Sequence, residues 1–415
     1  MSTATSTIAD VEAQHMSQVG SAPIVLCLGP SFENASTDQL APLLALLRDA
    51  LGEMAADAVV AYPVSDPQAA SWQHDGMALQ PFLPSAHLQT ISVQTATSYI
   101  GLHEVMRAHE SICGILLGAE AQTLAPHTVR LMVEAVLDHN ADLALPNYAL
   151  HPNEALLNAA LLAPLSRAIF GVRAHFPLAL DLALSMRMAE RMAVAAQKFT
   201  AAGQPEAIQW PAAEAAAAGY TVAEVEAGPR ELPPPSDVDL ATVLNSVATS
   251  LFADIEAKAS YWQRTRPAAT LLHMGDAAQA PSDNDPVAQD EIDGLIESFR
   301  LGYTNLHEIW ALVLPPHTLL GLKRLSAAPA ETFRMTDALW VRIVFDFVLA
   351  HRLRTINRGH LLGALTPLYL AWVATHLLQM QIAPLVDTID PLARAFEADK
   401  PYLVSRWRWP DRFNP

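Results

Sequence analysis

The sequence predicts an α/β fold, in which a mostly parallel sheet is flanked by helices and followed by a helical C-terminal extension. The first observation is a series of short apolar runs closed by polar or turn residues, as in strands buried on both faces. The second is that segments with helical spacing separate these runs, which is typical of a parallel sheet. The third is that the chain after residue 238 looks helical almost throughout.

The individual elements follow from local patterns. "APIVLCLGP" (22–30) is an apolar run closed by Gly-Pro, and "SICGILLGAE" (111–120) is a run that meets its first charge at Glu120. The helix at 125–139 has Pro126 in its first turn, where a missing N–H costs nothing. Residues 154–202 are expected to be largely helical. The expected strands are 22–30, 56–66, 111–120, 141–148 and 219–228, and the earlier helices are 38–54, 97–109 and 125–139.

A length of 415 residues suits two domains, or one domain with a large appendage. Residues 1–22 are polar and Ser/Thr-rich and are expected to form a disordered tail. An α/β domain is expected over 23–235 and a helical region over 236–415, joined by a proline-rich connector. Within the second region, 275–291 has few apolar residues and is expected to be a mobile loop.

The composition excludes some classes of partner. The net charge of −18 argues against nucleic acids and anionic membranes, because both require clustered Lys and Arg. The run from Leu361 to Met380 has the length of a membrane span, but it contains Pro367, His376 and Gln379, so a buried helix is expected. A cytoplasmic location follows by default.

The only two cysteines, Cys27 and Cys113, lie in apolar runs and are expected to be core residues without a disulfide. Two acids follow predicted strands. Asp66 ends the run 56–66, and Glu120 ends the run 111–120. Ligands of parallel sheets bind beyond the carboxyl ends of the strands, so both acids lie at the edge where a site is expected.

Several stretches resemble one bacterial glycosyltransferase family. They are "ADLALPNYALHPNEALLNAALLAPLSRAIFG" (141–171), "FPLALDLALSMRMA" (176–189), "LWVRIVFDFVLAHR" (339–352), "HLLGALTPLYLAW" (360–372) and "EADKPYLVSRW" (397–407). In order and spacing they resemble the family of mannosylglycerate synthase and glucosyl-phosphoglycerate-type synthases, which has the GT-A fold.

The resemblance implies a nucleotide-sugar donor, a small hydroxylated acceptor and a retaining transfer. It also implies Mg²⁺ or Mn²⁺, which would neutralise the charge that develops on the leaving nucleoside diphosphate. By the same resemblance, Glu120 would contact the donor and Asp181 would be the catalytic acid beside the sugar. Asp66, placed at the same edge of the sheet by its strand, is also assigned to the donor. His151, Glu154 and Asn158 would contact the acceptor.

The chain departs from the family where the metal binds. The family's Asp-x-Asp falls on Gly118-Ala119-Glu120, and its Gly-Gly-Asp falls on Ala179-Leu180-Asp181. Its later Gly-Ile-Asp falls on Ala207-Ile208-Gln209. The histidine expected near the end of the late strand is missing from "GPRELPPP". A single Glu without neighbouring ligands should bind a divalent metal poorly, so no metal ligand and no cofactor is assigned.

We therefore expect a glycosyltransferase-like protein that is catalytically weak or inactive, a pseudo-glycosyltransferase. The alternative is an active enzyme that moves a hexose from a UDP- or GDP-sugar to a small hydroxy acid, with Mg or Mn as cofactor. Leu180, Leu156 and Leu157 replace small or polar residues, so the cleft bounded by Asp66, Glu120 and Asp181 should be narrow and apolar. A homo-oligomer or a protein partner is left open.

Overall fold

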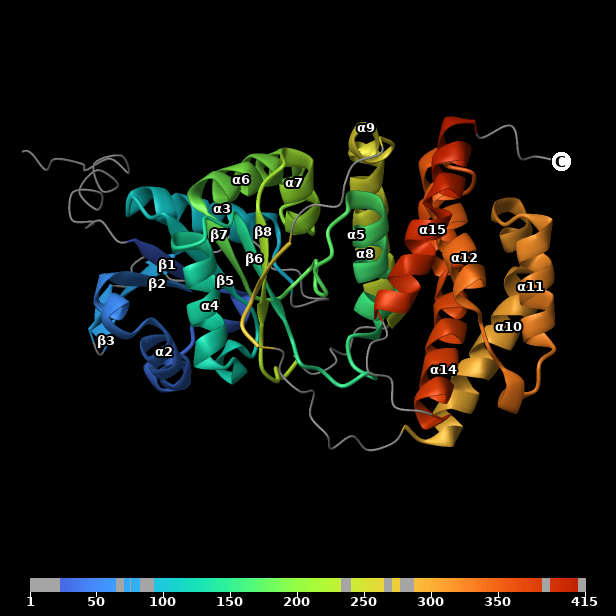
Figure 1. The fold of residues 1–415 in the computed structure, drawn as a ribbon, viewed down its shortest axis with the longest axis horizontal. Helices are drawn as coiled ribbons and strands as arrows, with labels where there is room; N and C mark the ends of the chain where they lie inside the picture. The colour runs from blue at the N-terminus through green and yellow to red at the C-terminus, as the bar shows by residue number, and fades with distance from the viewer. Residues whose placement is uncertain are drawn as a thin grey trace, which may run out of the picture.

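The computed structural model describes residues 23–64, 71–74, 76–82, 93–232, 240–264, 271–276, 287–382 and 389–409. These residues form one nine-stranded sheet, with helices around it and a group of helices beside it (Figure 1). The spatial order of the strands is β3-β4-β2-β1-β5-β7-β6-β8-β9. Their bounds are β1 Ile24–Leu28, β2 Ala58–Pro63, β3 Trp72–His74, β4 Met77–Phe82, β5 Cys113–Leu117, β6 Leu143–Asn147, β7 Leu182–Ser185, β8 Val222–Glu226 and β9 Leu271–Met274.

Most neighbouring strands run parallel, and the predicted fold class is confirmed. The β1–β2, β1–β5, β2–β4, β6–β8 and β8–β9 pairs are parallel. Every residue of β1 and β5 is buried, as expected from their unbroken apolar runs. The five predicted strands contain β1, β2, β5, β6 and β8.

Two strands lie where helices were expected. β7 falls within the predicted helical stretch 154–202, and it runs antiparallel to both β5 and β6, between which it is inserted. β9 falls within the region 236–415, which was predicted to be helical, and it pairs parallel with β8 at the edge of the sheet. The sheet therefore extends past the boundary predicted at residue 235.

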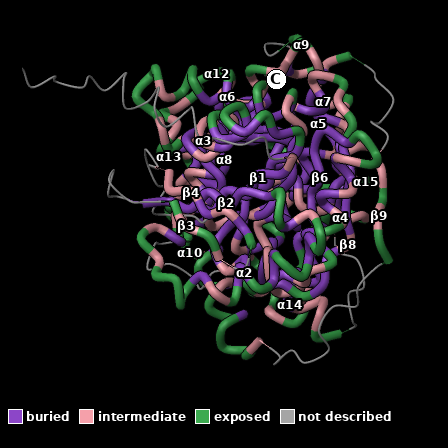
Figure 2. Tube along the Cα trace, turned by 90° about the vertical axis from the view of Figure 1, so that its left-hand side faces the viewer, coloured by how far each residue is buried: buried purple, intermediate pink, exposed green. Residues whose placement is uncertain are grey.

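Two helical layers cover the sheet. α3 packs with α6 on one side, and α2 packs with α4 on the other (Figures 1 and 2). α2 begins at a capping box, in which the Ser36 side chain accepts from the Gln39 amide and the Gln39 side chain accepts from the Ser36 amide. These helices and their neighbours are α2 Thr37–Leu51, α3 Ala96–Ala108, α4 Pro126–Leu137, α5 Ala163–Phe170, α6 Met186–Ala201 and α7 Pro211–Ala218.

The remaining helices gather beside the sheet (Figure 1). α5 packs against α15, and the buried Trp340 indole of α12 donates to the Ala160 carbonyl at 2.8 Å, so the helical group is joined to the segment that precedes α5. These helices are α8 Leu240–Ala257, α9 Ala259–Trp262, α10 Gln289–Val313, α11 Pro316–Ser326, α12 Asp337–Leu353, α13 Arg358–Gly363, α14 Thr366–Ile382 and α15 Ile389–Arg408.

Among the described residues, one helical stretch, Arg358–Ile382, is long and apolar enough to cross a membrane. In this fold, 72% of its most apolar window is buried. His376 lies within it and its imidazole is hydrogen-bonded to the Pro152 carbonyl at 2.8 Å. These contacts are those of a core helix, as the sequence predicted.

Both cysteines are buried and free, which confirms their assignment to the core. Burial raises the pKa of each thiol well above its ordinary value. Neither Cys27 nor Cys113 is therefore a reactive thiolate at neutral pH.

Stability at mildly acidic pH should depend on His351 of α12. Its side chain is 0% exposed, neither ring nitrogen has a partner in the described structure, and Phe252 packs edge-on against the ring. Burial lowers the pKa of His351 from 6.5 to about 4. As the pH falls, His351 is therefore protonated in the unfolded chain before it is protonated in the folded chain. The contribution of neutral His351 to the free energy of unfolding is complete above pH 6.5 and is lost as the pH falls towards 4.

The loss attributable to His351 should approach about 3 kcal/mol near pH 4, at roughly 1.4 kcal/mol per pKa unit. Urea denaturation at pH 7 and pH 4.5 measures it, and His351→Leu should be less sensitive to acid than the parent chain. The exposed His360→Gln is the control. Equal acid sensitivity in His351→Leu and the parent would contradict the assignment.

Candidate functional site

Asp181 lies directly before β7 and is completely buried. Its Oδ1 accepts from the Gly118 amide at 2.8 Å, and its Oδ2 accepts from the Tyr148 hydroxyl at 2.8 Å. Tyr148 also accepts from the Asp181 amide at 3.1 Å. Burial, followed by the neighbouring Asp181 charge, holds the pKa of Tyr148 well above its ordinary value, so the phenol stays protonated and can donate.

Arg230 follows β8 and supplies the cation that faces Asp181. Its Nε donates to Asp181 Oδ2 at 3.0 Å, and both side chains are 0% exposed. Its two terminal nitrogens donate to the carbonyl oxygens of Ala119 and Glu120, and one also donates to Thr123 Oγ1 at 3.0 Å. The guanidinium therefore connects the loop after β5 to the residue before β7, and its charge is fully paired inside the protein.

Gly118 is held in close contact with Leu180. A Cβ atom at position 118 would lie 2.9 Å from the Leu180 carbonyl oxygen and 3.0 Å from its Cβ. Real Cβ atoms essentially never lie within 3.0 Å of another heavy atom of this kind, so any residue larger than glycine forces this segment to move. An acid at this position, as in the family's Asp-x-Asp, does not fit the backbone arrangement.

Glu120 lies at the predicted edge of the sheet, in the left-handed region with φ of 59°. Its Oε2 accepts from the Gln122 amide nitrogen at 2.6 Å, while its carbonyl accepts from Arg230 and from Thr123 Oγ1. No group of three or more His, Cys, Asp or Glu among the described residues could hold a metal ion. The described residues around Glu120 therefore do not by themselves fit the Mg²⁺ or Mn²⁺ that the family resemblance implies.

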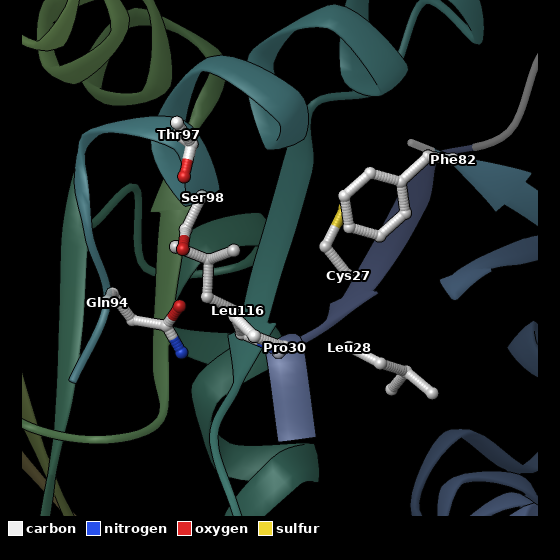
Figure 3. Close-up of a pocket in the computed structure, with 9 residues that line it drawn as sticks. Cys27, Leu28, Pro30, Phe82, Gln94, Thr97, Ser98 and Leu116 are labelled. Carbon is white, nitrogen blue, oxygen red and sulfur yellow. The ribbon is translucent and has the colours of Figure 1, made fainter. Parts of the chain in front are cut away.

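A small cavity lies beyond the carboxyl end of β1 (Figure 3). Gln94 donates to the Leu180 carbonyl at 2.9 Å across this region, and its own Oε1 is buried without a partner in the described structure. The cavity volume of about 20 Å³ holds roughly one water molecule, whereas small-molecule sites usually measure about 300–1,000 Å³. Its lining residues are Cys27, Leu28, Gly29, Pro30, Phe82, Gln94, Thr97, Ser98 and Leu116.

The structure describes the predicted acceptor residues and one of the two predicted donor residues. Asp66 lies outside the described residues, so its place beside Glu120 and Asp181 stays a prediction, as does the narrow cleft bounded by the three. Glu154 accepts from the backbone amide of His151 at 2.8 Å, and the two form one turn. Asn158 is buried and donates to the His175 carbonyl at 2.8 Å. The Glu154 and Asn158 side chains thus make contacts within the protein.

Sequence reasoning missed Arg230 and Tyr148. Arg230 is the single basic residue of "GPRELPPP", the stretch from which the family's histidine is missing. A positive charge where the family has a metal ligand was the feature of the sequence that could have pointed to Arg230. Tyr148 closes the predicted strand 141–148 at the same edge of the sheet. Together with Gly118 and Asp181, these residues form what we call the Asp181–Arg230 cluster.

Comparisons with known proteins give limited support. No protein-family model matches the chain, and no curated protein matches it. Among solved structures, the chain is similar to glucosyl-3-phosphoglycerate synthase from Mycobacterium tuberculosis, solved in complex with Mn²⁺, UDP-glucose and phosphoglyceric acid. The TM-score is 0.31 and the identity 14%, over 61% of this chain and 86% of that chain. The likeness is weak.

Proposed function

We propose that this chain is a glycosyltransferase-like protein that does not carry out metal-dependent sugar transfer. The Asp181–Arg230 cluster carries this proposal. In the family that the sequence resembles, this edge of the sheet holds a divalent cation and an acid that faces the sugar. Here the acid is paired with a guanidinium, and neither side chain reaches solvent.

The chemistry of the cluster supports a structural role for Asp181. A carboxylate that acts on a sugar must contact it, and Asp181 already accepts from Gly118, Tyr148 and Arg230. Opening the cluster for a substrate would leave charge buried without its partner, which costs several kcal/mol. In this proposal Asp181 is therefore not the catalytic acid that the sequence predicted. Instead, Asp181 holds the loop after β5 in position.

The cluster also supports metal independence. Arg230 brings a permanent positive charge to the carbonyl oxygens of Ala119 and Glu120. A divalent ion placed next to that guanidinium would be repelled by it, and the crowding of Gly118 leaves no room for a second acid. Glu120 alone would supply too few oxygen ligands for Mg²⁺ or Mn²⁺.

We expect the protein to bind nucleotide sugars weakly, with a Kd of about 1 mM, which corresponds to roughly −4 kcal/mol. The test incubates the purified protein with UDP-glucose or GDP-mannose and a small hydroxy acid, with and without Mn²⁺, and quantifies released UDP or GDP by chromatography. The proposal predicts no release above the protein-free control. Turnover that disappears in Asp181→Asn would instead identify an active transferase.

A further inference from the structure

The helix α15 contains a proline that divides it into two parts. Pro401 lies inside the helix, and residues 402–408 follow it. Proline has no backbone N–H, so the helix lacks one of its own hydrogen bonds at this position. The two parts of α15 are therefore joined less firmly than successive turns of an unbroken helix.

The part of α15 before the proline is attached to α5. Arg167 of α5 forms ion pairs with Asp390 and Glu397, and its Nε lies 3.0 Å from Glu397 Oε1. The hydrogen bond from Arg167 holds the pKa of Asp390 below its ordinary value. The pair of Arg167 with Asp390 therefore keeps both of its charges between pH 6 and pH 8.

The part of α15 after the proline, residues 402–408, is attached to α12, which lies beside it (Figure 1). Oδ1 of Asp346, on α12, accepts from the Tyr402 hydroxyl at 2.7 Å and from the Arg406 guanidinium. Both donors come from residues 402–408, so one carboxyl group of α12 holds this segment at two points.

Asp346 is a buried acid with one oxygen that lacks a partner. Its side chain is 0% exposed, and its Oδ2 has no hydrogen-bond partner among the described residues. A carboxylate that is cut off from water and accepts hydrogen bonds at only one oxygen is disfavoured relative to the neutral acid. The packing of α15 on α12 therefore favours the protonated form of Asp346.

The groups that act on Asp346 come from two helices. Burial raises the pKa of Asp346 to about 7, although Tyr402 and Arg406 of α15 and Arg342 of α12 favour the ionised form. The helices α8, α10, α11 and α13 also pack against α12, and none of their described groups contributes to this shift.

Separation of residues 402–408 from α12 would expose Asp346 to water and return its pKa towards the ordinary value of 3.8. The packed form therefore binds this proton more tightly than the opened form. The resulting stabilisation of the packed form is complete below pH 3.8 and is lost as the pH rises through 7.

We infer that residues 402–408 form a pH-sensitive latch, which pivots at Pro401 and separates from α12 more often when Asp346 is ionised. The part of α15 before the proline stays on α5. The opened form remains the minor one, because Arg352 of α12 also donates to the Trp407 carbonyl, at 2.5 Å, whatever the state of Asp346. This inference does not depend on the function proposed for the sheet.

Hydrogen–deuterium exchange of the full chain, followed by mass spectrometry at pH 6 and pH 8, tests the latch. The rates are corrected for the intrinsic effect of pH on amide exchange. Exchange of residues 402–408 should be about tenfold faster at pH 8 than at pH 6, because the packed form holds its extra proton only at the lower pH. Exchange of residues 389–400 should not change.

Two matched variants assign the effect to Asp346. Asp346→Asn keeps an oxygen that accepts from Tyr402 and Arg406 but cannot ionise, so the difference between the two pH values should disappear. Asp390→Asn, the same substitution before the proline, should keep the tenfold difference. If Asp346→Asn does not fold, the two pH values of the parent chain decide.

Four results would overturn the inference. The first two are equal exchange of residues 402–408 at both pH values in the parent chain, and faster exchange at pH 6. The third is the full tenfold difference in Asp346→Asn. The fourth is an equal rise in residues 389–400, which would show that α15 moves as one helix and does not pivot at Pro401.

Discussion

Replacing Arg230 by methionine should lower the free energy of unfolding by about 3–5 kcal/mol. The substitution keeps much of the apolar stem but leaves the Asp181 carboxyl group 0% exposed and without its cation. The Ala119 carbonyl loses its Arg230 donor at the same time, while the Glu120 carbonyl keeps its hydrogen bonds from Thr123. Urea denaturation followed by circular dichroism measures the change.

Two further variants make this result specific. The double variant Asp181→Asn with Arg230→Met should regain part of the loss, because no buried charge is then left unpaired and the side-chain amide oxygen can still accept from Gly118 or Tyr148. The control is Arg394→Met, which breaks the exposed ion pair with Asp390 and should change stability by less than about 1 kcal/mol. A cost as small as this in Arg230→Met would show that the buried pair does not stabilise the sheet edge.

Gly118→Asp, which restores the first acid of the family's metal motif, should destabilise the protein and create no metal site. The new Cβ would meet the Leu180 carbonyl oxygen at 2.9 Å, and overpacking of this kind costs about 1–3 kcal/mol before the buried charge is counted. The added carboxylate also lies beside Asp181, which raises the cost further. Thermal unfolding and Mn²⁺ titration of the variant measure both effects.

Gly118→Ala measures the steric part of this destabilisation without an added charge, and Gly294→Ala is its control. A Cβ at Gly294 meets nothing within 4 Å, and this residue lies inside α10, where alanine is favoured over glycine by about 0.5–1 kcal/mol. The two alanine substitutions should therefore shift the melting temperature in opposite directions. A stable Gly118→Asp protein that binds Mn²⁺ tightly would contradict the account of the crowded strand end.

The fold class could be predicted because the buried parallel strands carry unbroken apolar runs. β1 and β5 are examples, and both lie within their predicted ranges. β7 could not be recognised, because "LALS" lies between Ala- and Met-rich residues whose spacing also suits a helix. A four-residue strand is specified by its neighbours β5 and β6 rather than by its own periodicity.

Local sequence patterns also could not predict which charged residues pair between different helices. Helical spacing alone predicts that the buried Asp346 of α12 pairs with Arg342, one turn earlier in the same helix. Instead its Oδ1 accepts from Arg406 and from the Tyr402 hydroxyl, both on α15, while Arg342 pairs with Asp399. Helical spacing identifies neighbours within one helix, but it contains no information on which helix packs opposite.

In the candidate site, too, some features follow from residue type alone and others depend on contacts between distant residues. The residue types at Gly118 and Gln209, where the family has acids, can be read from the sequence alone, and the weak metal binding expected from them stays a prediction. The hydrogen bond from Arg230 to the Glu120 carbonyl joins residues 110 positions apart, and local sequence patterns do not predict such a contact. The steric closure at Gly118 likewise depends on Leu180, which approaches from the segment before β7.

Direct titration of Mn²⁺ by electron paramagnetic resonance, with and without UDP-glucose, tests the central claim, that a buried arginine occupies the place of the metal. The free Mn²⁺ signal should match that of buffer at protein concentrations of about 100 µM, because binding at Glu120 should be no tighter than about 1 mM, roughly −4 kcal/mol. Saturable binding with a micromolar Kd that is lost in Glu120→Gln would contradict the claim and would restore a metal-dependent site to this edge of the sheet.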